Sequence, residues 1–284
     1  MPGWFGSRGR IAAQAGRIEL KSPRELELIR AAGHVVHAVL AQLRELAGPG
    51  LKTRALGEAA DRIIGAAGGE ALFRGVRTQS AAMPFPAAVC VSVNEEVVHG
   101  IPGERELRPG DVVSVDCGVR LRGYCADAAT TIPIGPVSGD VRRLLEVTSA
   151  ALELAIREMR PGRWWSEIAA QMQELVESSG FAVVREFVGH GIGREMHEEP
   201  KVPNYTDREQ RKSDFELRPG LVIAVEPMVT MGTANVKHGD ATGWPQVTRD
   251  GSWAAHFEHT LAVVEGGVAV LTDGRPGPAT TTGA

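Results

Sequence analysis

LRPGDVVSVD, from Leu107 to Asp116, and LRPGLVIAVE, from Leu217 to Glu226, match at six of ten positions at an offset of 110 residues. Each stretch predicts an apolar strand that ends in a carboxylate. Because a duplicated strand has kept an acid at its end twice, we expect the two halves of the chain to bring carboxylates together at a pseudo-twofold centre. Carboxylates that converge away from water generally need a cation.

The repeat extends beyond the strands. PGLKTRALGEAADRIIGAAG (Pro49–Gly68) aligns with PGRWWSEIAAQMQELVESSG (Pro161–Gly180) at an offset of 112, with apolar residues at helical spacing in both segments. Coincidence between common Pro-Gly turns is the alternative explanation, and the agreement of two separate segments on nearly one offset argues against it. Each half is therefore predicted to run from a helix to a strand that ends in an acid.

Composition excludes several classes of protein. With 284 residues, 43% of them hydrophobic and 23% charged, the chain can bury a substantial core. A net charge of −4 and a pI near 6.1 do not indicate the positively charged surface that binds nucleic acid. The apolar runs are shorter than the ~20 residues that span a bilayer. The odd number of cysteines, without CxxC spacing, argues against a disulfide framework and a zinc ribbon. A reducing compartment, the cytoplasm, fits these features.

The ends of the chain differ from its body. Residues 1–20 contain three arginines but no continuous apolar region, so they predict a flexible arm rather than a signal peptide. Residues 272–284 are turn-forming and weakly apolar, which predicts a disordered tail. No linker divides the segment between them, so we expect a single domain over residues 21–271.

The pattern of elements predicts an α+β fold. Ser22, Pro23 and Glu25 form a capping box before a helix that continues to Gly48. Further helices are expected over Thr53–Ala67, Gly139–Met159 and Trp164–Ser179. A β-hairpin is expected to turn at Asn94-Glu95 and to end at His99. Other strands are expected over Val112–Val115, Tyr124–Ile134 and Phe181–Val188, and in a final β region that holds Glu258 and Val263. We expect an antiparallel-rich curved sheet packed on four helices about a pseudo-twofold axis.

Ionisable residues occupy strand ends and glycine-rich turns. They are His99, Asp116, Asp127, His190, His197, Glu226 and Glu258. Acids are depleted from strands, and a buried ionised carboxylate costs several kcal/mol unless it is paired or bound to metal. If four carboxylates converge, each pair at about 4 Å repels by ~4 kcal/mol at an effective dielectric of ~20, and two divalent cations would cancel that charge.

Four carboxylates and one imidazole make a hard, oxygen-rich donor set. Such a set suits Mn, Fe(II), Co or Zn better than a thiolate-type structural zinc, and it leaves room for a water whose pKa falls from 15.7 toward ~7. Alternatives remain open at each position. If no metal binds, the histidines would be structural and the cysteines would be small packing residues. The four carboxylates would then be ordinary strand acids that face solvent, namely Asp116, Asp127, Glu226 and Glu258.

Five motifs resemble those of one family. They are similar to the signature segments of methionine aminopeptidases, in the bacterial short form known as type I, and they read VNEEVVHGIP, VDCG with YCADAATT, GHGIGREMHEEP, VIAVEPM and HFEHTL. The resemblance covers Lys21 to Leu271, nearly the entire chain. It implies the pita-bread fold, two divalent ions (Co²⁺, Mn²⁺, Fe²⁺ or Zn²⁺) and co-translational removal of the initiator methionine, and it makes residues 21–271 the catalytic domain.

The resemblance also assigns residues, position by position. The metal ligands would be Asp116, Asp127, His190, Glu226 and Glu258, with Asp127 and Glu258 bridging both ions. His99 and His197 would contact the substrate, and Glu226 would double as general base. Phe85, Cys90, Met196 and Trp244 would line the methionine pocket. Met196 replaces the phenylalanine usual in the family and Ala82 falls where an aromatic residue is common, so a softer, roomier pocket is expected.

Two rival functions remain to be weighed. Prolidases and aminopeptidase P share this fold but carry a substantial additional N-terminal domain, which twenty residues cannot supply. Some pita-bread proteins are binding modules that lack the ligands, whereas all five candidates stand in this chain. The expected partners are the N-terminal methionines of peptides and nascent polypeptides. The choice of ion, the role of the arm and any transient ribosome association stay open, and a monomer is the default expectation.

Overall fold

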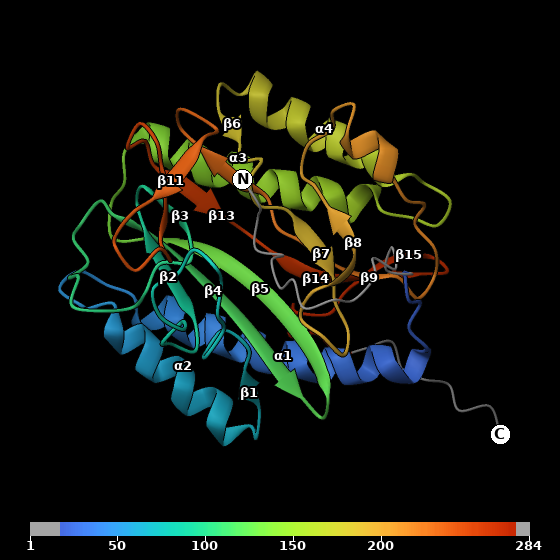
Figure 1. Ribbon diagram of the computed structural model, residues 1–284, viewed down its shortest axis with the longest axis horizontal. Coiled ribbons are helices and arrows are strands. Elements are labelled where there is room, and N and C mark those ends of the chain that lie inside the picture. The colour runs from blue at the N-terminus through green and yellow to red at the C-terminus, as the bar shows by residue number, and fades with distance from the viewer. Residues whose placement is uncertain (1–17, 277–284) are drawn as a thin grey trace.

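Four α-helices lie within residues 18–276, the part of the chain that the structure, a computed structural model, describes (Figure 1). The predicted capping box is present at the first helix, since Ser22 Oγ accepts a bond from the Glu25 N–H and the Ser22 N–H donates to Glu25 Oε2 at 2.9 Å. Each predicted helix is confirmed to within two residues at either end. Their bounds are α1 Pro23–Leu46, α2 Arg54–Ala66, α3 Gly139–Glu158 and α4 Trp165–Ser178.

The described strands form four sheets, and every ladder is antiparallel. One larger sheet holds β1 (Glu70–Ala71), β2 (Cys90–Val93), β4 (Val112–Leu121) and β5 (Tyr124–Pro133). The other holds β7 (Gly189–Gly191), β8 (Glu198–Val202), β9 (Val222–Val225), β14 (His259–Val264) and β15 (Gly267–Val270). The two small sheets hold β13 (Ala254–His256), β10 (Met228–Thr230) and β6 (Ala182–Val183), and β11 (Val236–His238), β12 (Gln246–Thr248) and β3 (Glu96–Val98).

Equivalent hydrogen bonds in the two halves establish the internal repeat. An isolated antiparallel bridge joins Lys52 to Glu106, and its counterpart joins Trp164 to Glu216. The turns that precede them repeat as well, because the Gly50 N–H donates to the Leu107 carbonyl at 2.8 Å and the Gly162 N–H donates to the Leu217 carbonyl at 2.9 Å. The matching segments therefore have matching conformations, as duplication predicts.

Two sequence-based expectations are corrected by the strands. Asp116 does not end its strand, because the ladder between β4 and β5 continues from Val112 to Leu121 and leaves this acid in the middle. The predicted hairpin has the right strands, but β2 pairs with β4 while β3 pairs with β12 in another sheet. The predicted strand over 181–188 is short, since only Ala182–Val183 pairs.

Helices cover the sheets on two opposite sides. α1 and α2 lie below β4 and β5 in Figure 1, and α3 and α4 lie on the far side above β13 and β8. The halves meet along a seam where the Glu258 N–H donates to the Ala129 carbonyl at 2.9 Å. The Thr260 hydroxyl adds a second link, since it accepts from the Asp127 N–H and donates to the Asp127 carbonyl. This seam brings Asp127 and Glu258 side by side.

The ends of the described chain pack on the domain. Residues 1–17 and 277–284, which make up most of the predicted arm and tail, lie outside the described residues. Ile18 packs against the hydrophobic cluster of α4 and β9, and Thr272 is buried with its hydroxyl against His259 Nδ1 at 2.8 Å. None of the helices in residues 18–276 combines the length and apolar composition that crossing a bilayer requires.

Candidate metal centre

Three of the predicted ligands form one tight group. A carboxylate oxygen of Asp127, a ring nitrogen of His190 and a carboxylate oxygen of Glu258 all lie within 4.8 Å of one another, and all three residues are buried. They come from β5, β7 and the link between β13 and β14, so no two are close in the sequence. The tertiary fold alone assembles this group.

The other two predicted ligands join the group from β4 and β9. Asp116 pairs with Ala129 in the β4–β5 ladder, which makes Asp127 its diagonal neighbour on the same face of the sheet. Glu226 follows β9 directly, and its Oε1 lies 3.6 Å from His190 Nε2. All five predicted ligands are thus brought to one place.

Burial shapes the electrostatics of this cluster. Burial raises the pKa of Asp127 to about 7, while the adjacent Asp116 carboxyl opposes that rise. Burial, with the neighbouring Asp127, raises the pKa of Glu226 to about 8. Burial first and the other carboxylates second hold the pKa values of Asp116 and Glu258 well above their usual ranges. Without a cation, the cluster therefore binds protons that ordinary carboxylates release.

Unpaired oxygens indicate that the cluster fits a metal. Among the described residues, Asp116 Oδ1, Asp127 Oδ1 and Glu258 Oε1 are enclosed and accept no hydrogen bond. A buried carboxylate oxygen without a donor is costly, and a bound cation satisfies it. Three carboxylate oxygens and an imidazole nitrogen form a donor set typical of divalent ions of the Mn, Fe, Co and Zn type.

The ring of His190 is oriented for metal ligation. Its Nδ1 lies 2.9 Å from the Gly191 carbonyl, and because a carbonyl only accepts, Nδ1 carries the hydrogen and Nε2 presents its lone pair to the cluster. Burial lowers the pKa of His190 to about 4, so the imidazole is neutral at pH 7. A purely structural histidine at this position would not need to present the Nε2 lone pair to the carboxylates.

The two histidines predicted to contact substrate flank the cluster. The His197 ring lies 4.3 Å from the His190 ring, and the His99 ring packs edge-on against Phe187 at 5.3 Å between ring centres. His99 has a φ of 61°, a left-handed conformation that is uncommon for a residue other than glycine and clusters at functional sites. Burial lowers the pKa values of His99 and His197 to about 3, so both are neutral at pH 7.

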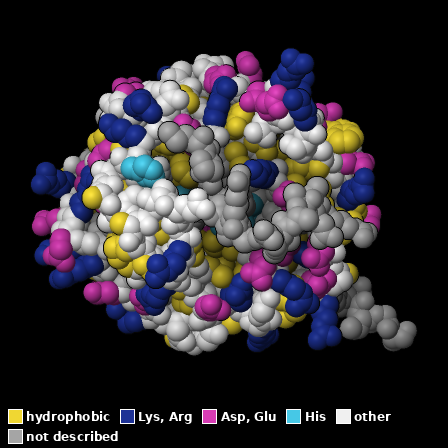
Figure 2. All heavy atoms as spheres, in the orientation of Figure 1, with side chains coloured by type: hydrophobic (Ala, Val, Ile, Leu, Met, Phe, Trp, Pro, Cys, Tyr) yellow, Lys and Arg dark blue, Asp and Glu magenta, His cyan; other side chains and the backbone are white. Residues whose placement is uncertain are grey.

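A cleft of about 490 Å³ gives access to these groups. Its inner wall contains the five candidate ligands with His99 and His197, and its outer part contains Arg77, Arg185 and Lys201. Figure 2 shows that Lys and Arg side chains are interspersed with Asp and Glu over the face seen there, as the small net charge leads one to expect.

An apolar group adjoins the cleft. The four residues predicted to line a methionine pocket, Phe85, Cys90, Met196 and Trp244, pack in one cluster with Phe73. The Phe85 and Trp244 rings meet edge-on at 5.2 Å, and the Trp244 ring N–H donates to the Met83 carbonyl at 2.8 Å. Phe73, which also lines the cleft, was missed because no local pattern distinguishes it from an ordinary core residue.

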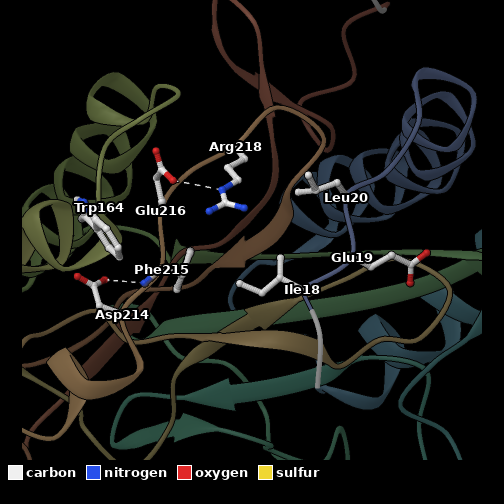
Figure 3. A pocket seen from close by; sticks show the side chains of 8 residues that line it. All are labelled: Ile18, Glu19, Leu20, Trp164, Asp214, Phe215, Glu216 and Arg218. Carbon is white, nitrogen blue, oxygen red and sulfur yellow. Dashed lines mark hydrogen bonds and ion pairs between the residues drawn. The ribbon is translucent and has the colours of Figure 1, made fainter. Parts of the chain in front are cut away.

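A second hollow lies away from the cluster. It measures about 830 Å³ and lies beside Ile18 and Trp164, with an ion pair between Glu216 and Arg218 at 3.2 Å (Figure 3). None of the predicted site residues lines it. The larger of the two hollows is therefore not the one that contains the candidate metal ligands.

Comparison with known proteins decides the family. The sequence profile of metallopeptidase family M24 matches residues 27–265. The chain belongs to this family, among the methionine aminopeptidases. It is 43% identical to methionine aminopeptidase 1 of Bacillus subtilis, over 89% of this chain and 98% of that protein, and 42% identical to the methionine aminopeptidase of Aquifex aeolicus, over 90% and 99%.

Solved structures agree with this M24 assignment. The methionine aminopeptidase of Thermotoga maritima superposes with a TM-score of 0.84 at 38% identity, over 90% of this chain and 99% of that one. The prolidase of Pyrococcus furiosus shares the fold with a TM-score of 0.68 at 20% identity, over 90% of this chain and 65% of that one. The predicted pita-bread fold is confirmed, and the protein is a metal-dependent aminopeptidase.

Proposed function

We propose that this protein hydrolyses the peptide bond after an N-terminal methionine, with two divalent ions held by Asp116, Asp127, His190, Glu226 and Glu258. The observation that carries the proposal is the convergence of Asp127, His190 and Glu258 within 4.8 Å, with donor-free carboxylate oxygens beside them. Asp127 and Glu258, which lie on the seam between the halves, would each hold both ions.

The metal ions, when bound, would polarise the scissile carbonyl and lower the pKa of a water molecule. Glu226 would serve as the general base, since its side chain is 14% exposed and so more open to the cleft than those of His190 and Glu258. The neutral rings of His99 and His197 offer ring N–H donors to the substrate, and a donor fixed in a buried site stabilises developing negative charge.

Selection of methionine is assigned to the apolar cluster. A flexible thioether side chain would enter the cleft beside Met196, whose sulfur offers a polarisable wall, and beside Phe73. Phe85, Cys90 and Trp244 pack behind these two residues in the same cluster. Met196 is 9% exposed and lines the cleft, so its size affects the depth of the pocket. We expect a preference for methionine with some tolerance for longer apolar side chains.

One experiment tests reaction, specificity and cofactor together. The chelated protein is loaded anaerobically with Mn²⁺, Fe²⁺, Co²⁺ or Zn²⁺ and assayed with a Met-Ala-Ser peptide and with an Ala-Pro peptide, while bound metal is counted. We expect two ions per chain and turnover of Met-Ala-Ser alone. Turnover of the Ala-Pro peptide would favour a prolidase-type function, and a protein without metal or hydrolysis would be a binding module.

The cellular setting of this activity belongs to the proposal as well. We place the enzyme in the cytoplasm as a monomer with one catalytic domain over residues 21–271, acting on peptides and nascent polypeptides. Three free, buried cysteines support a reducing compartment. Transient association with the ribosome would suit a substrate that emerges there.

A further inference from the structure

His256 lies beside the candidate metal ligands, although the motif that contains it gave it no role there. It is 2% exposed, and its Nε2 is among the enclosed atoms that have no hydrogen-bond partner in the described residues. That nitrogen lies 3.8 Å from Glu226 Oε2 and 4.0 Å from Glu258 Oε2. An imidazole nitrogen thus faces two candidate ligands at just beyond hydrogen-bond distance.

The main chain of His256 is held on both sides. Its N–H donates to Thr131 Oγ1 at 2.8 Å, and its carbonyl accepts from the same hydroxyl at 2.9 Å. The ladder between β10 and β13 pairs it with Met228. Since the backbone cannot move far, the ring adjusts only by rotation, which suits a group that holds another side chain in place.

Distances give the direction of the ring. His256, at the end of β13, points its Nε2 toward Glu226 and Glu258, whereas His259, at the start of β14, points elsewhere. His259 Nδ1 instead lies 2.8 Å from Thr272 Oγ1. The HFEH segment therefore contains one histidine directed at the carboxylates and one directed away, which provides a matched control.

We infer that His256 is a positioning residue whose Nε2–H donates to Oε2 of Glu226 and fixes that carboxylate for metal binding and proton transfer. A lone pair on Nε2 would face two anionic oxygens, so the tautomer with hydrogen on Nε2 is favoured. Glu226 would then be held at Oε2 by His256, while its Oε1 faces the Nε2 lone pair of His190 across 3.6 Å, as two ligands of one cation would. The inference rests on the proposed metal centre.

Metal binding tests this role without relying on activity. Wild type, His256→Leu, His256→Gln and His259→Gln are chelated and titrated with Co²⁺, with affinity measured by calorimetry and coordination by visible absorption. Loss of a carboxylate's outer hydrogen bond typically costs 10- to 100-fold in metal affinity. We expect that loss in His256→Leu together with a shifted Co²⁺ spectrum, recovery to within a few-fold in His256→Gln because the amide donates, and wild-type behaviour in His259→Gln.

Kinetics and a direct measurement on the wild type complete the test. In His256→Leu, we expect kcat to fall more than KM rises, because Glu226 is displaced while the methionine pocket is intact. If His256→Leu binds both ions with wild-type affinity and spectrum, the inference is wrong. Nitrogen-15 NMR of the Zn²⁺-loaded wild type reports the tautomer without any substitution, and hydrogen on Nδ1 instead of Nε2 would overturn it too. A wild type that binds no metal would refute the proposed function instead.

Discussion

Removing one acid from the centre should stabilise the metal-free protein at high pH. Glu226 has a pKa of about 8 in the fold, against an ordinary value of 4.5, because burial and Asp127 disfavour its charge. Between these two pH values the folded state holds a proton that the unfolded state has released, so stability falls as pH rises. Glu226→Gln removes this effect, since the amide does not titrate.

The size of the effect follows from the difference in pKa. Each pH unit over which one extra proton is bound contributes about 1.4 kcal/mol. From pH 5 to pH 9, Glu226 holds its proton over roughly three units, so wild type should lose about 4 kcal/mol relative to Glu226→Gln. The buried histidines have lowered pKa values and act in the opposite sense below pH 6.5, but they are common to both proteins and cancel in the comparison.

Urea unfolding of both proteins in a chelating buffer at pH 5, 7 and 9 measures this difference. We expect equal stabilities at pH 5 and a clear advantage for Glu226→Gln at pH 9. Addition of Mn²⁺ should stabilise wild type at pH 9 by binding the ionised carboxylates. A difference that stays within about 1 kcal/mol across the range would show that Glu226 is not buried among the other acids, and the reasoning would fail.

Three further predictions address other parts of the site. Asp127→Ala should retain fewer than two ions and lose more than about 100-fold in kcat/KM, and retention of both ions with full activity would exclude a bridging role. Met196→Phe should raise the preference for Met- over Leu- and norleucine-peptides by roughly tenfold, whereas an unchanged preference would remove Met196 from the pocket. Gly191→Ala should cost about 3 kcal/mol in urea unfolding, because a Cβ there overlaps the Glu199 carbonyl; wild-type stability would mean that β7 and β8 are farther apart.

The helices were the most predictable elements of the fold. Ser22, Pro23 and Glu25 are local signals that act within one turn, and the resulting helix begins where they place it. The strands were less predictable, because pairing depends on partners far along the chain. Asp116 illustrates the difference, since only the long ladder with β5 extends its strand beyond the acid.

The candidate site divides in a similar way. The seven ionisable residues could be named in advance because acids and histidines are unusual beside apolar strand segments. His256 could not be separated from His259, since both flank Glu258 and only the direction of the chain between β13 and β14 tells them apart. Phe73 carried no signal at all.

The sequence by itself determined the duplicated architecture, the helices, the family and the types of group at the centre, because repeats, capping residues and motifs are written in local order. Tertiary structure alone decided which oxygens lack donors, which pKa values rise and which histidine faces Glu226. Those properties depend on distances of a few ångströms between residues that are far apart in the chain, such as Asp127 and Glu258, which are 131 positions apart. Burial and Coulomb energies vary steeply over such distances, and a linear pattern does not encode them.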